Sequence, residues 1–366
     1  MSNVLKYDTR TTQSTDIPRL SLGVRWLPIG GMLIALVGAF ILMLMLGSVR
    51  IPLEEILTII TGGEASKASW QTIILQFRLP KATTALLAGA ALGVSGLMMQ
   101  TFFRNPLAGP FILGINSGAS LGVALVVLAS GTIGGVVIAG LGFAGDLALA
   151  FAAGIGAAIT MAIVLLIAHQ VRNSMTLLIL GLMFGYLTSA LVSLLLYFAI
   201  PEHIQTYIYW TFGTFSGTTW QQLQIFAPMV LIGVIFAWGL SKTLNAMLLG
   251  ENYARSMGMN IQLARIAIVS VTAVLAGAVT AFCGPIGFIG IAVPHLCRSL
   301  LNTSDHRTLI PATVIMGGLV ALVAAIIAEV PGSQIVLPLN AITSLIGAPV
   351  VMFVILRRRN IAKAFS

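Results

Sequence analysis

The chain has 366 residues, of which 58% are hydrophobic and only 8% are charged. Soluble domains carry about a quarter charged residues, so this composition excludes a soluble enzyme and indicates an integral membrane protein. The net charge of +9 could indicate nucleic-acid binding in a soluble protein. In a membrane protein it reflects the preference of Lys and Arg for cytoplasmic loops.

The N-terminal stretch is polar and carries the basic residues Lys6, Arg10, Arg19 and Arg25. It is too long for the charged region of a secretory signal, and the apolar run after it has no small-residue cleavage site. We therefore expect residues 1–25 to form a cytoplasmic segment and residues 26–366 to form a single membrane domain that keeps its first helix.

A helix needs about 20 apolar residues to cross a bilayer. Such runs are expected, in chain order, at residues 26–47, 82–102, 112–131, 147–169, 174–200, 222–241, 263–283, 285–300, 309–328 and 339–356. The tail carries Arg357, Arg358, Arg359 and Lys363, so basic residues at both ends place both termini in the cytoplasm. This requires an even number of crossings, and we expect an all-α fold of ten transmembrane helices. Glycines recur at close spacing in the second and third helices, which we interpret as dense helix packing.

Three connections are longer than the others. Residues 48–81 and 201–221 are expected outside, the first with an interfacial helix in IPLEEILTII and the second with interfacial aromatic residues. Residues 242–262 form the largest internal loop. Within it, Glu251 begins a short helix after Gly250, where the helix dipole favours an acid, and Gly258 closes that helix. A membrane-surface helix would carry several basic residues. This one carries only Arg255, which favours contact with a partner protein over contact with lipid.

The eighth apolar run is interrupted by glycine and proline. The residues concerned are Gly284, Pro285, Gly287, Gly290 and Pro294. Broken helices persist at membrane depth only where protein or a water-filled cavity covers the freed backbone groups. The segment therefore indicates a path through the membrane. His295 and Cys297 invite a metal interpretation, but a buried Cys usually behaves as a small hydrophobe, and we expect neither a metal nor a cofactor on this chain.

Motifs for chemistry are missing from the sequence. There is no phosphate loop, and no acid lies at a helix centre, where an ion-coupled carrier would need one. An embedded enzyme would also need positioned acids, bases or metal ligands. We therefore expect a non-enzymatic protein, and if it moves something uphill the energy must come from another subunit.

Four stretches resemble the FecCD-type permeases, the membrane subunits of bacterial ABC importers for iron–siderophore complexes, haem and cobalamin. They are RLPKATTALLAGAALGVSGLMMQTFFRNPLAGPFILGINSGAS, LLGENYARSMGM, GPIGFIGIAVPHLCRSLLNTSDHR and PLNAITSLIGAPVVMFVILRR. The resemblance implies a ten-helix fold like that of the cobalamin permeases (the type II importer architecture) in the bacterial inner membrane. It also implies a homodimer with its path at the two-fold interface, two cytoplasmic ATPases that use ATP and Mg, and an external substrate-binding protein.

The resemblance also assigns roles to individual residues. The coupling helix, which inserts into the ATPase, includes Gly250, Glu251, Ala254, Arg255 and Gly258. The cytoplasmic gates match Asn105, Pro106 and Leu107, and Asn173, Ser174 and Met175. An ordinary turn is the alternative for Asn105-Pro106.

On the outer face, Arg78 and Lys81 match basic residues that dock the binding protein, although they could simply cap the second helix. Glu329 stands where cobalamin permeases carry a third basic residue. It either pairs with Lys81 or meets a basic residue on a different binding protein.

Three cargoes fit the resemblance. We expect a ferric siderophore first, because most of the family serves iron, with cobalamin as the alternative and haem third. A membrane sensor or scaffold is a different class of function. It would need neither a broken helix nor a coupling loop.

Overall fold

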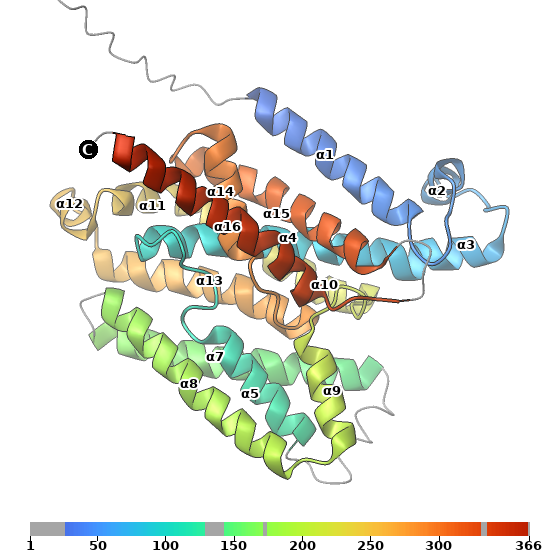
Figure 1. Cartoon of the computed structure of the whole chain (residues 1–366), viewed down its shortest axis with the longest axis horizontal. Coiled ribbons are helices and arrows are strands. Elements are labelled where there is room, and N and C mark those ends of the chain that lie inside the picture. Colours follow the sequence, from blue (N-terminus) through green and yellow to red (C-terminus); the bar gives the residue numbers. More distant parts are fainter. Residues whose placement is uncertain (1–25, 129–142, 171–173, 331–334, 365–366) are drawn as a thin grey trace, which may run out of the picture.

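The computed structural model describes residues 26–128, 143–170, 174–330 and 335–364, and within these ranges the regular structure is entirely helical (Figure 1). The helices of the first half are α1 (Trp26–Met45), α2 (Leu53–Ile60), α3 (Ala68–Thr72), the π-helical η1 (Ile73–Arg78), α4 (Leu79–Phe102), α5 (Ile115–Leu128), α7 (Phe143–Gln170) and α8 (Ser174–Phe198). Those of the second half are α9 (Pro201–Thr211), α10 (Trp220–Gly239), α11 (Ser241–Leu248), α12 (Glu251–Ser256), α13 (Ile261–Cys283), α14 (Ile289–Leu301), α15 (His306–Ala328) and α16 (Leu339–Ala364).

Every predicted membrane segment overlaps one of these helices. Within the described residues, seven helices are long and apolar enough to cross a membrane. Three shorter apolar helices, at Ile115–Leu128, Ile289–Leu301 and Leu339–Phe353, occupy the other predicted positions. The all-helical membrane fold is thus confirmed, while ten complete crossings stay a prediction. Residues 1–25 and the extreme C-terminus lie outside the described residues, and so does the predicted side of both termini.

Helix α4 is the centre of the fold, and its side chains are almost all buried. Its glycines allow neighbouring backbones to approach closely, as predicted for dense packing. A methyl group on Gly96 would lie 1.7 Å from the carbonyl oxygen of Gly290 in α14, and one on Gly89 would lie 2.1 Å from that of Gly317 in α15. Neither position has room for a side chain, so α4 is in direct backbone contact with both helices.

Helices α5, α7, α8 and α9 form a second group beside α13 (Figure 1). Small residues again line the contacts: Gly118 and Gly156 meet between α5 and α7, and Gly277 lies against Ala157 between α13 and α7. The groups are joined mainly through α7 and α13. Large apolar side chains on the outer faces, such as Leu182 and Leu194 of α8, are exposed, as expected for surfaces in contact with lipid or another subunit.

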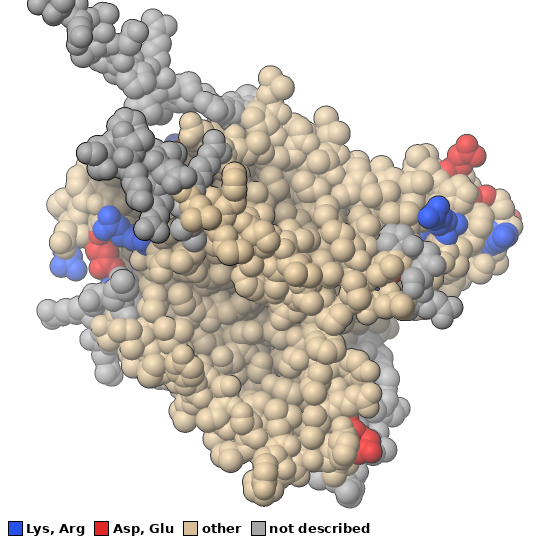
Figure 2. All heavy atoms as spheres, viewed as in Figure 1, with Lys and Arg blue, Asp and Glu red and all other residues tan. Residues whose placement is uncertain are grey.

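Charged side chains gather towards the ends of the molecule, and the middle of the face shown in Figure 2 is nearly free of them. We call the end that carries α2 and α3 the outer end and the end that carries α11 and α12 the inner end, following the sequence prediction. Arg50 and Lys67 flank α2 and α3 at the outer end, whereas Arg255 is in α12 and Arg104 lines a cavity beside it at the inner end. This separation is the pattern expected of a protein that spans a membrane.

Candidate functional site

The short helix predicted after Gly250 is present at the inner end as α12 (Glu251–Ser256), and its coupling role stays a prediction. Gly250 precedes it with φ +109° and Gly258 follows it with φ +83°, both in the left-handed region that favours glycine. Glu251 lies in the first turn and binds Arg265 of α13, with oxygens 3.2 and 3.4 Å from Nη2. The Arg265 side chain is buried. The ion pair therefore fixes the start of α12 to the membrane bundle.

Two faces of α12 differ in character. Ala254 is fully buried and packs with Ala246 and Ile261. Arg255 and Tyr253 are exposed. A cavity of about 490 Å³ separates α12 from the end of α4. It is lined by Phe102, Phe103, Arg104, Met247, Leu249, Gly250, Glu251, Asn252 and Tyr253. The inner end thus presents a small helix anchored on one side and open on the other.

The predicted gate turn follows α4 directly. The Asn105 side-chain oxygen accepts a hydrogen bond from the Leu107 amide at 2.9 Å, so the turn is locally closed as Asn-Pro favours. Nε2 of His295, a buried residue of α14, donates to the Pro106 carbonyl at 2.7 Å. Leu107 remains 46% exposed. The second predicted gate is not tested, because Asn173 and the side chains of Ser174 and Met175 lie outside the described residues.

The interrupted segment is a true break between α13 and α14. Gly284 has φ +75°, and a methyl group there would lie 2.7 Å from the Trp210 carbonyl oxygen. Its freed backbone groups find partners in neighbouring segments: the Thr214 amide donates to the Cys283 carbonyl at 2.8 Å, and the Gly287 amide donates to Asn340 Oδ1 at 3.0 Å. Protein therefore covers the break, as a broken helix at membrane depth requires.

Arg78 lies at the outer end but is 8% exposed. Its Nη1 donates to the Leu44 carbonyl at 2.7 Å and to the Met45 carbonyl at 3.2 Å, and its Nη2 donates to the Val49 carbonyl. The Leu44 and Met45 carbonyls end α1, where a cation also meets the negative end of the helix dipole, and Val49 lies in the segment after it. Arg78 therefore caps the first membrane helix, whereas the sequence suggested a cap on the second.

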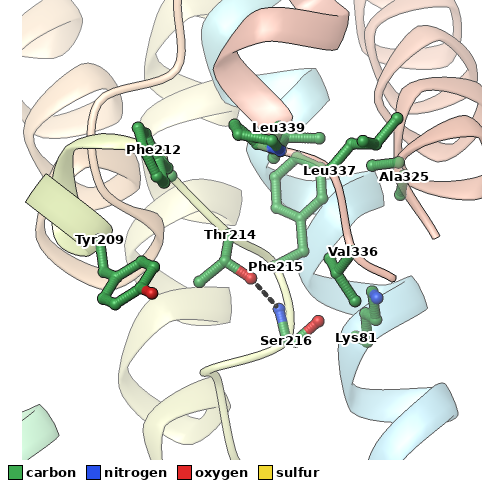
Figure 3. Close-up of a pocket in the computed structure, with 13 residues that line it drawn as sticks. Lys81, Tyr209, Phe212, Thr214, Phe215, Ser216, Ala325, Val336, Leu337 and Leu339 are labelled. Carbon is green, nitrogen blue, oxygen red and sulfur yellow. Dashed lines mark hydrogen bonds between the residues drawn. The ribbon is translucent and has the colours of Figure 1, made fainter. Parts of the chain in front are cut away.

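Lys81 pairs with Glu329, so the internal pairing that was one of the two alternatives for Glu329 is present. The pair is partly buried, with 11% and 23% of the two side chains exposed. Lys81 also borders a cavity of about 280 Å³ that is otherwise mostly apolar, formed by residues 209–216, the end of α15 and the segment leading to α16 (Figure 3). Neither Arg78 nor Lys81 presents a free charge to solvent in this arrangement, and their docking role stays a prediction.

Several buried polar residues were missed by the sequence analysis. Gln100 of α4 accepts from Arg298 Nη1 at 2.5 Å and donates to the Ile291 carbonyl at 3.1 Å. His306 of α15 contacts Asn245 and Thr101. A polar residue inside an apolar run could have indicated these contacts, because such residues need buried partners.

Asp305 shows the electrostatics of the same region. Burial alone would raise the pKa of its carboxyl group, but hydrogen bonds from the Asn245 amide and the Arg307 backbone outweigh it and lower the pKa. Asp305 thus stays ionised as the N-cap of α15. Within the described ranges, no three His, Cys, Asp or Glu residues are grouped as a metal site.

Comparisons with known proteins agree with this architecture. The sequence profile of the FecCD transport family matches residues 34–357. The vitamin B12 import system permease protein BtuC of Klebsiella pneumoniae is 38% identical over 82% of this chain and 87% of that protein. BtuC of Citrobacter koseri is 34% identical over 82% and 88%.

Among solved structures, one described as an inward-facing conformation of a metal-chelate type ABC transporter matches with a TM-score of 0.77. It has 28% sequence identity, over 90% of this chain and 98% of that chain. The curated relatives named here import vitamin B12, so these matches favour the predicted alternative cargo over a siderophore. The chain is a multi-pass membrane protein and an ABC importer permease, and it belongs to the FecCD transport family.

Proposed function

We propose that this chain is the permease subunit of an inner-membrane importer for cobalamin, driven by a separate ATPase. The observation that carries the cargo is the match to vitamin B12 permeases over about four-fifths of the chain. A ferric siderophore is the second candidate, supported by the metal-chelate transporter with the same fold. Both are large metal chelates, and a weakly interacting path would suit either.

A separate energy source is supported by the distribution of charge. In the described spans the acids lie at helix ends, as Glu329 does, so no midplane carboxylate is available for proton or sodium coupling. The chain would be non-enzymatic, and ATP and Mg would be used by the partner. Two ATPase copies would dock on α12, which leaves Tyr253 and Arg255 exposed while Ala254 anchors it.

Two copies of the chain would enclose the path between them, with the external binding protein above. The exposed apolar face of α8 supplies a surface for such pairing. The turn at Asn105–Leu107 would form one inner gate and the residues around Ser174 the other. The outer docking surface would include the region around Lys81 and Glu329. Because these two charges neutralise each other, shape and apolar contact would be the main determinants of binding-protein affinity there.

The test is uptake into proteoliposomes that hold this chain with the ATPase and binding protein encoded beside it. Labelled cyanocobalamin and a labelled ferric siderophore are compared, each with ATP and with a non-hydrolysable analogue. Accumulation of cobalamin only with ATP is the expected result. Accumulation of iron alone would overturn the cargo but keep the mechanism, and ATP-independent movement of either compound would overturn the mechanism.

A further inference from the structure

A chain of polar contacts, buried at its centre between His306 and Thr101, runs across the inner end from the loop that carries α12 to the gate turn. It begins at Asn245 in α11, six residues before the start of α12. Asn245 Oδ1 accepts from the His306 backbone amide at 2.9 Å and from His306 Nδ1 at 2.7 Å, while its Nδ2 donates to Asp305 at 2.6 Å. The start of α15 is thus bound to α11 by one amide side chain.

His306 also connects α15 to α4. Because Nδ1–H donates to Asn245, the other ring nitrogen, Nε2, is an acceptor, and the Thr101 hydroxyl lies 2.7 Å from it. The same hydroxyl is also 2.9 Å from the Leu97 carbonyl of its own helix, so it is shared between the two acceptors. His306 and Thr101 are each 1% exposed. Water cannot replace either partner there, so the loss of this contact costs free energy of folding.

The neighbouring residue of α4 continues the chain. Gln100 is bound to Arg298 and to the Ile291 carbonyl, both in α14. His295 of the same helix holds the Pro106 carbonyl of the gate turn. Gly290 of α14 also lies against Pro110, where a methyl group would be 2.6 Å from Cδ. The gate turn is therefore fixed to α14, and α14 to the end of α4.

We propose that His306 is a positioning residue that transmits movement of the coupling loop to the gate turn through Thr101 and Gln100. The inference rests on the proposed function, because it requires α12 to receive an ATPase and residues 105–107 to gate a path. The alternative is that these contacts only stabilise the fold, as buried polar contacts elsewhere in α4 do.

The chain offers a matched control. Thr84 is also fully buried in α4, but its hydroxyl bonds only to the Pro80 carbonyl of its own helix, at 2.8 Å. Thr101→Val and Thr84→Val each remove one buried hydroxyl with little change in volume. Thr101→Ser restores the hydroxyl at the tested position. Differences between these variants report the contact with His306 and not the loss of a polar group in general.

The experiment uses the assembled transporter in proteoliposomes and two readouts. One is cargo taken up per ATP hydrolysed, with whichever chelate the wild type transports. The other is the mobility of a spin label on Leu107→Cys when ATP is added, since Leu107 is half exposed and the chain's own Cys283 and Cys297 are buried. The second readout does not depend on knowing the cargo.

We expect Thr101→Val to lower uptake per ATP by about tenfold, the factor expected for one buried hydrogen bond, and to abolish the label's response. Thr84→Val and Thr101→Ser should behave like the wild type. Equal behaviour of Thr101→Val and Thr84→Val would overturn the inference, as would a Thr101→Val variant whose thermal stability falls while its coupling ratio is unchanged. A wild-type complex that moves no chelate and shows no label response would instead refute the proposed function.

Discussion

Lys81 and Glu329 lie 248 positions apart in the chain and form an ion pair at the outer end. The contact joins the first turn of α4 to the residue that ends α15. A cation beside the last carbonyls of α15 also complements the helix dipole there. The pair therefore holds two central helices together at the end where the proposed external partner would dock.

Removing one member of the pair should destabilise the protein. Lys81→Met leaves the Glu329 carboxylate partly buried without its cation, at an expected cost of about 1–3 kcal/mol, between the values for exposed and buried pairs. The measurement is thermal unfolding in detergent. The exchanged variant, Lys81→Glu with Glu329→Lys, should recover most of the loss, and an exchange no more stable than the single variants would argue against the pair.

The same variants test docking. If the binding protein uses the charge of Lys81, the exchanged variant should bind it more weakly, and the remaining affinity should depend on salt. Lys67→Glu, an exposed substitution on the same end, is the control for long-range charge. Equal affinity of the wild type and the exchanged variant would leave Lys81 with a structural role only.

Glu251→Ala should uncouple the ATPase from uptake. The substitution removes the carboxylate that fixes the start of α12 to Arg265, so the helix loses its orientation for docking. We expect about a tenfold loss in ATPase affinity, comparable to losing one charge-assisted hydrogen bond. The measurement is ATPase binding to the reconstituted chain, with Glu54→Ala at the outer end as control. Wild-type affinity in the Glu251 variant would contradict a docking role for α12.

The sequence predicted the features that depend on local pattern. The apolar runs located the membrane helices, and Gly250 and Gly258 bounded α12 because left-handed backbone favours glycine. Contacts between distant segments could not be predicted from local pattern. His306 and Thr101 are 205 positions apart, and only the packing of α15 against α4 brings them together. The helix that Arg78 caps was not predicted for the same reason: its partners are carbonyls that end α1, which no local spacing indicates.

Gly96→Ala should prevent α14 from packing on α4. The added methyl group would meet the Gly290 carbonyl oxygen at 1.7 Å, and both partners are backbone, so neither can move aside alone. We expect a loss of about 3 kcal/mol or failure to fold, the upper range for overpacking. Gly38→Ala in α1 is the control, because nothing lies within 4 Å of its added methyl group. The measurements are thermal unfolding and protein yield in detergent. A Gly96→Ala protein as stable as Gly38→Ala would contradict the described contact.

Asn340→Leu should disturb the break between α13 and α14. Asn340 Oδ1 is the acceptor for the Gly287 amide, and its own backbone amide donates to the Phe212 carbonyl at 3.0 Å. The first residues of α16 thus support both the break and the segment after α9. Leucine keeps the approximate volume but leaves the partly buried Gly287 amide without its acceptor, at a cost of about 1–3 kcal/mol. Because the break lies on the proposed path, uptake should fall by more than the change in thermal stability explains.

The matched control is Ser344→Ala, one turn later in α16, whose hydroxyl bonds only to the Asn340 carbonyl of its own helix. Asn340→Asp is the informative third variant. It keeps the acceptor oxygen but places a charge at membrane depth, where charge is costly. If the acceptor alone matters, Asn340→Asp should recover part of the stability lost in Asn340→Leu. If all three variants transported at the wild-type rate, the break would need no support from α16, and its backbone groups would have to be satisfied by water in an open path.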